Sequence, residues 1–178
     1  LKPFSINFHL GERVDEIKKI ENKWEVKTNK GKCFITPNVI IAGGVGSFEP
    51  RKFSPKECAN FEDKSIFYSV KNKKIFEGKT VSIFGGGDSA LDWAVELSKK
   101  SKVNLIHRRD EFRGAQATLD KVYELQKSGK INLFTKYQLK SVKGNGTLES
   151  IDIEHENKEI INLKSDYVLG FFGLIMQL

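Results

Sequence analysis

Hydrophobic and polar residues alternate in the first part of the chain with the two-residue period of β-strands. The alternation predicts three short strands, at residues 14–20, 24–28 and 32–36. Turns rich in asparagine, lysine and glycine separate them, so we expect a β-meander. A fourth run, at residues 39–42, is continuously apolar and ends in two glycines, which predicts a buried strand.

The same order of elements returns near the end of the chain. Alternation predicts strands near residues 137–143, 148–155 and 159–164, again with turn residues between them. An apolar run at 166–170 follows and leads to Phe172-Gly173. The chain therefore contains two copies of one meander followed by one strand.

A complete βαβ unit precedes the second copy. Residues 80–84 form a β-branched, apolar run, and residues 88–100 repeat apolar positions with helical spacing. Residues 103–107 predict the next strand, and 118–128 predict a helix that Gly129 ends. This order predicts an α/β fold, namely a Rossmann-like domain with a β-meander.

The two copies also predict the domain organisation. Residues 71–172 hold every element of one domain, and residues 173–178 begin the return to the other. Residues 1–70 hold the middle portion of a second, similar domain and a proline-containing linker. The spacing of the second copy places the first copy's glycine turn before residue 1, so we expect the first domain to be partial.

Composition excludes several classes of protein. The net charge is +7, but the basic excess is spread over both halves, so we expect no nucleic-acid partner. No apolar run approaches the ~20 residues of a membrane span, and the opening residues 1–5 do not resemble the apolar core of a signal peptide, so we expect a cytoplasmic protein without a membrane anchor. The two cysteines, Cys33 and Cys58, are too far apart for a CxxC motif or a metal site.

A glycine turn follows the strand at 80–84, with the sequence Gly85-Gly86-Gly87-Asp88-Ser89-Ala90. It fits the GxGxxA fingerprint of dinucleotide-binding domains, in which a glycine lets the pyrophosphate approach the backbone and a small residue lets the helix pack closely. Asp88 or Ser89 would cap the helix, whose N-terminus attracts phosphate. The alternative is a glycine-rich turn that binds nothing.

The end of the next strand predicts which dinucleotide binds. An NAD site needs a carboxylate about 20 residues after the glycines, whereas a 2′-phosphate needs arginine. This chain has His107-Arg108-Arg109 there, and Arg113 follows. Guanidinium groups stay charged and bind phosphate through two hydrogen bonds, so the sequence predicts NADP(H). In the alternative, Asp110 and Glu111 pair with these arginines as a solvated cluster.

These motifs, with Phe76-Glu77-Gly78-Lys79 before the strand, resemble the low-molecular-weight thioredoxin reductases of the pyridine nucleotide-disulfide oxidoreductase family. They look closest to the thioredoxin reductase-type ferredoxin/flavodoxin NADP reductases. The resemblance implies an enzyme with NADPH and FAD as cofactors, and a homodimer as the complete protein. It makes residues 1–70 a partial FAD-binding domain and 71–172 the NADPH-binding domain. Ala42, Gly43 and Gly44 would line the flavin site, or would form an ordinary turn.

Thioredoxin reductases carry a CxxC dithiol shortly before the glycine turn, but this chain has Phe67-Tyr68-Ser69-Val70 there. Disulfide exchange needs one thiol to attack and another to resolve the intermediate. The sequence therefore favours ferredoxin or flavodoxin as electron acceptor. Because the cofactors carry the redox chemistry, we assign no catalytic residue in this chain. The alternatives are a family disulfide reductase that lacks its dithiol and a redox-inactive NADP-binding module.

Overall fold

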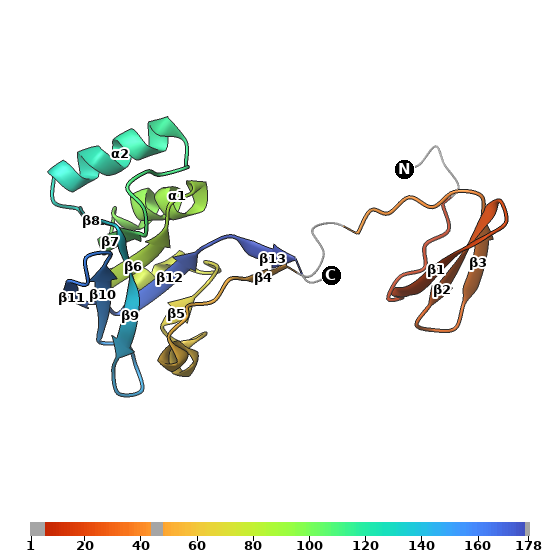
Figure 1. The fold of residues 1–178 in the computed structure, drawn as a ribbon, viewed down its shortest axis with the longest axis horizontal. Helices are drawn as coiled ribbons and strands as arrows, with labels where there is room; N and C mark the ends of the chain where they lie inside the picture. Colours follow the sequence, from red (N-terminus) through yellow and green to blue (C-terminus); the bar gives the residue numbers. More distant parts are fainter. Residues whose placement is uncertain (1–5, 44–47, 177–178) are drawn as a thin grey trace. The chain divides into compact units, whose positions relative to one another are not determined.

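The computed structural model describes residues 6–43 and 48–176. The chain divides into two compact units, residues 1–45 and 46–178, and each is described by itself (Figure 1). The second unit begins at Gly46, so it includes the segment before residue 71 that the sequence assigned to the linker.

The first unit is the predicted meander. Strands β1 (Val14–Ile20), β2 (Lys23–Thr28) and β3 (Cys33–Thr36) form an antiparallel sheet in the order β1-β2-β3. The predicted strand at 39–42 is wrong, because Ile40 and Ile41 lie outside any strand and are 90% and 82% exposed. A buried strand needs neighbours on both sides, and no described residue pairs with this segment.

The second unit is built on a parallel sheet with the strand order β5-β12-β6-β7-β8. The strands are β5 (Ile66–Phe67), β6 (Thr80–Gly85), β7 (Lys102–His107), β8 (Ile131–Thr135) and β12 (Tyr167–Phe171). The fold class predicted from the sequence is confirmed, although β5 and β8 were not predicted.

The sheet is covered on both faces, as Figure 1 shows. Helices α1 (Asp88–Leu97) and α2 (Gln116–Lys127) cover one face, where they bury alternate strand residues such as Ile83 and Leu105. The intervening residues Phe84 and Ile106 face the other layer. That layer is the second meander, formed by β9 (Tyr137–Lys143), β10 (Ser150–His155) and β11 (Ile160–Lys164).

Two short strands bring the linker to the end of the sheet. β4 (Phe48–Pro50) pairs antiparallel with β13 (Leu174–Met176), and the Arg51 N–H donates to the Gly173 carbonyl at 3.2 Å. Short 3₁₀ helices at Lys56–Phe61 and Lys73–Phe76 complete the described elements. No helix in the described ranges is long and apolar enough to cross a membrane.

Candidate functional site

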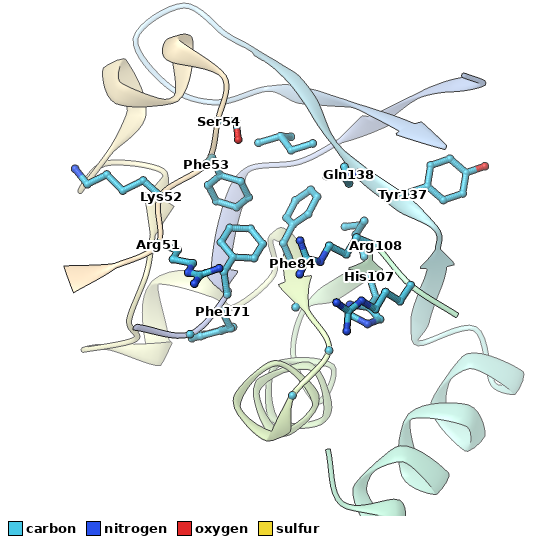
Figure 2. A pocket seen from close by; sticks show the side chains of 18 of the residues that line it. Arg51, Lys52, Phe53, Ser54, Phe84, His107, Arg108, Tyr137, Gln138 and Phe171 are labelled. Carbon is cyan, nitrogen blue, oxygen red and sulfur yellow. The ribbon is translucent and has the colours of Figure 1, made fainter. Parts of the chain in front are cut away.

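A pocket of about 450 Å³ opens where β6, β7 and β12 end (Figure 2). This edge is the usual ligand position in an open α/β sheet, because the turns that leave the strands diverge there. The predicted site residues in its lining are Gly85, Gly86, Gly87, His107, Arg108, Arg109 and Arg113.

The glycine turn uses its first and third glycines for different purposes. Gly85 has φ +153°, and a Cβ there would lie 2.7 Å from the Phe171 carbonyl oxygen and 2.8 Å from the Ala90 Cβ. Gly85 is therefore needed for packing of strand, helix and turn. A Cβ on Gly87 would meet nothing within 4 Å, so this residue leaves open space at the pocket.

Helix α1 starts directly after the turn. Gly87 is its N-cap, so the expectation that Asp88 or Ser89 caps the helix is wrong. Both side chains are exposed and lie outside the pocket lining, whereas Ala90 is fully buried. Asp88 instead accepts a hydrogen bond from the Ala115 N–H through Oδ1, at 2.7 Å. Its carboxylate is therefore turned toward the segment that precedes α2.

Residues 108–115, here called the arginine loop, fold back onto the glycine turn. The Arg113 N–H donates to the Gly86 carbonyl at 2.7 Å, and the Asp88–Ala115 bond closes the far end. His107, the last residue of β7, donates from Nε2 to the carbonyl of Glu111 in the loop at 3.0 Å. Backbone and side-chain hydrogen bonds thus fix the loop before any ligand is present.

The arginine loop presents its positive charge to the pocket. Arg108, Arg109 and Arg113 are exposed, and none forms an ion pair with a carboxylate in the described ranges. Asp110 pairs with Lys136 at 3.0 Å instead, and Glu111 contributes its backbone carbonyl to His107. The arrangement differs from the solvated cluster in which these acidic residues would neutralise the arginines.

His107 lines the pocket with an imidazole ring whose environment favours the neutral form. Burial lowers the pKa of its imidazole, and the positive arginines of the loop lower it further, against the opposing effect of the Glu111 hydrogen bond. A neutral ring at pH 7 carries its proton on Nε2, because the Glu111 carbonyl can only accept.

The opposite side of the pocket was not predicted from the sequence. Figure 2 shows Arg51 and Phe53, which belong to the linker, on one side of Phe84, with Arg108 and His107 on its other side. The Phe53 ring packs edge-on against Phe84 at 5.2 Å and against Phe172 at 4.8 Å between centroids. This aromatic wall, Phe53, Phe84 and Phe172, gives the pocket an apolar side opposite the arginine loop.

The residues predicted to line a flavin site belong to the first unit. Ala42 and Gly43 are exposed there, and Gly44 lies outside the described residues. Their assignment to FAD remains a prediction.

The two thiols differ sharply in access. Cys58 is 1% exposed, and burial raises its pKa to about 11, aided by Glu57 and Glu62. Cys33 is exposed on β3. No group of three metal-ligating side chains occurs in the part of the chain that the structure describes.

We expect the folded chain to react quickly with one equivalent of a thiol reagent such as DTNB, at Cys33, and with a second equivalent only after unfolding. The thiolate is the reactive species, and the pKa of both thiols is raised, mainly by desolvation. Access therefore decides the order, since Cys58 is 1% exposed and Cys33 is exposed. The Cys33→Ser variant should lose the fast phase and the Cys58→Ser variant should keep it. Two fast equivalents from the folded chain would contradict this assignment.

Comparison with known proteins gives consistent results. The model of the family described as pyridine nucleotide-disulphide oxidoreductase matches residues 1–175. A Pelagibacter ubique protein named ferredoxin--NADP reductase is 67% identical over 178 residues, which are all of this chain and 53% of that protein. A Flavobacterium johnsoniae protein of the same name is 45% identical, over all of this chain and 51% of that protein.

Among solved structures, the thioredoxin reductase of T. acidophilum matches with a TM-score of 0.76 at 23% identity, over 94% of this chain and 54% of that one. This likeness supports the fold. The chain spans about half the length of the curated relatives it matches. The resemblance inferred from the sequence motifs is confirmed, and the chain belongs to the pyridine nucleotide-disulphide oxidoreductase family.

Proposed function

We propose that this chain is the NADPH-binding portion of a flavoprotein reductase that passes hydride from NADPH to FAD and electrons on to ferredoxin or flavodoxin. The observation that carries the proposal is the arginine loop, whose guanidinium groups lack a described carboxylate partner and line the same pocket as the glycine turn. The curated relatives named ferredoxin--NADP reductase support the choice of acceptor.

The pyrophosphate of the dinucleotide would lie over Gly87. The first intrahelical hydrogen bonds of α1 are donated by Ala90 and Leu91 to the Gly87 carbonyl, so the N–H groups of Asp88 and Ser89 precede them. Such N–H groups and the positive end of the helix dipole bind phosphate. Gly87 leaves the space that close approach to this backbone requires.

The 2′-phosphate would bind the arginine loop at the end of β7. The three guanidinium groups can form charged hydrogen bonds to the phosphate dianion of NADPH. The 2′-hydroxyl of NADH carries no charge, so its hydrogen bonds to the same groups would be weaker. The loop therefore supports selection of NADPH over NADH. The aromatic wall opposite leaves an apolar surface against which a ring of the dinucleotide can pack.

Bound FAD would supply the redox chemistry, as acceptor of hydride and donor of electrons to a protein carrier. Ala42, Gly43 and Gly44 are the residues of this chain that we assign to the flavin. We assign residues 1–70 to the middle portion of an FAD-binding domain and the linker, 71–172 to the NADPH-binding domain and 173–178 to the return segment. The family likeness leads us to expect a homodimer.

The direct test is calorimetric titration of the chain with NADP⁺ and NAD⁺. We expect NADP⁺ to bind at least about a hundredfold more tightly, because at least two guanidinium groups would bind the 2′-phosphate and each charged hydrogen bond is worth about 1.5–3 kcal/mol. Equal affinity for the two, or binding of neither, would contradict the proposal.

Replacing Gly87 by alanine should weaken binding of NADP⁺ and NAD⁺ alike, by about tenfold or more, because the added methyl group occupies the space assigned to the pyrophosphate. The free energy of unfolding should change by less than about 1 kcal/mol, since the methyl group meets nothing in the ligand-free chain. Calorimetry and urea unfolding measure the two effects. Unchanged affinity for both dinucleotides would place the pyrophosphate elsewhere.

A further inference from the structure

The middle glycine of the turn is in contact with the His107 ring. A Cβ on Gly86 would overlap that ring, meeting its Cε1, Nδ1 and Nε2 atoms. Gly86 is buried, and it is not among the residues with positive φ, so its own backbone conformation accepts any L-residue. Glycine at this position is therefore explained by the imidazole that covers it.

The other side of the ring holds the arginine loop. Nε2 donates to the Glu111 carbonyl at 3.0 Å, and the Phe112 ring lies 4.9 Å from the imidazole between centroids. Glu111 and Phe112 stand between Arg109 and Arg113 in the chain. The Gly86 carbonyl meanwhile accepts from the Arg113 N–H at 2.7 Å. The imidazole is thus enclosed between the two elements to which we assign the phosphates.

We propose that Gly86 and His107 together form a seat that positions the arginine loop, so that both residues act on recognition of the 2′-phosphate without His107 binding it. The inference rests on the proposed function. It makes His107 a positioning residue, whereas the sequence alone placed it among the residues that contact the cofactor. The Nε2 proton is already committed to Glu111, which leaves this nitrogen no second proton to donate to a phosphate.

The seat predicts strong coupling between the two positions. In the full chain, Gly86→Ala should weaken NADP⁺ binding by about tenfold and reduce the NADP⁺/NAD⁺ affinity ratio, because the methyl group displaces the ring. His107→Ala should have a similar effect. The double variant should bind no worse than His107→Ala alone, since alanine at position 86 then meets no ring. Losses that simply add would show that the dinucleotide itself requires Gly86, and would overturn the inference.

A pair of conservative variants tests the hydrogen bond. The side-chain nitrogen of glutamine is as many bonds from Cα as Nε2 of histidine, so His107→Gln can still donate to the Glu111 carbonyl, whereas His107→Asn is too short. We expect His107→Gln to keep the NADP⁺/NAD⁺ ratio within about threefold and His107→Asn to lose about tenfold. Equal loss in both variants would contradict positioning through this bond.

Hydrogen exchange of the Arg113 amide gives a readout without ligand. This amide bonds to the Gly86 carbonyl, so its exchange should accelerate in Gly86→Ala and His107→Ala but not in His107→Gln. Unchanged exchange in every variant would overturn the seat. If the unsubstituted chain binds neither dinucleotide, the proposed function fails. If it binds NADP⁺ and the losses add, only the seat fails.

Discussion

Replacing Arg108 and Arg109 together by alanine is expected to weaken NADP⁺ binding at least about a hundredfold and to change NAD⁺ binding by less than about threefold. Each charged hydrogen bond to the 2′-phosphate contributes about 1.5–3 kcal/mol, and one decade of affinity corresponds to about 1.4 kcal/mol. Both side chains are exposed and have no ion-pair partner among the described carboxylates, so their removal leaves no buried charge behind. Calorimetric titration with each dinucleotide measures the difference.

A matched control separates this local effect from a general loss of positive charge. Lys121 and Lys127 are exposed residues of α2 outside the pocket lining, and their replacement by alanine removes the same charge. This control should reduce NADP⁺ affinity by less than about threefold at physiological salt, where distant surface charges are screened. Equal losses of NADP⁺ and NAD⁺ in the arginine variant would contradict a 2′-phosphate site.

Replacing Gly85 by alanine is expected to lower the free energy of unfolding of the second unit by about 2 kcal/mol or more. Its φ of +153° is a conformation that L-residues rarely adopt, which costs about 1–3 kcal/mol. The added Cβ would also press on the Phe171 carbonyl and Ala90, and overpacking of this kind costs a further ~1–3 kcal/mol.

Urea unfolding monitored by Trp93 fluorescence measures the effect. A Trp24→Phe background leaves Trp93, on α1, as the only tryptophan, so the signal reports on the second unit alone. Gly87→Ala, two positions later in the same turn, is the control and should lose less than about 1 kcal/mol. Equal stability of the two variants would show that Gly85 is not required for packing.

The sequence predicted those elements whose pattern is local. The β6 strand, both helices and the two meanders follow from hydrophobic period and turn residues, and all are present. The strand at 39–42 failed because an apolar run specifies burial only when a neighbouring strand is there to pair with it. β5 was missed because two residues carry no period. β8 was missed because the five residues Ile131–Thr135 are too few to show a clear alternation, although Gly129 marks the end of the helix before them.

The candidate site also has a part that the sequence predicted and a part that it did not. The glycine turn and the arginine loop were predictable because fixed spacing along one βαβ unit brings them to one edge. Arg51 and Phe53 were not predictable, since their position depends on long-range contacts, such as the pairing of β4 with β13 and the hydrogen bond from the Phe53 N–H to the Tyr68 hydroxyl. Nor could spacing reveal that His107 turns toward Gly86 and its own loop, which depends on side-chain packing.

The most direct test of the central claim compares two fragments of the dinucleotide on the same chain. Adenosine 2′,5′-bisphosphate carries the 2′-phosphate, and 5′-AMP is identical except for a hydroxyl in its place. If the arginine loop binds the 2′-phosphate, the bisphosphate should bind at least about a hundredfold more tightly, and this preference should fall by about a hundredfold in the Arg108→Ala/Arg109→Ala chain, where Arg113 is the remaining guanidinium group of the loop. Equal affinity for the two fragments in the unsubstituted chain, or a preference that loss of both arginines leaves unchanged, would contradict the account.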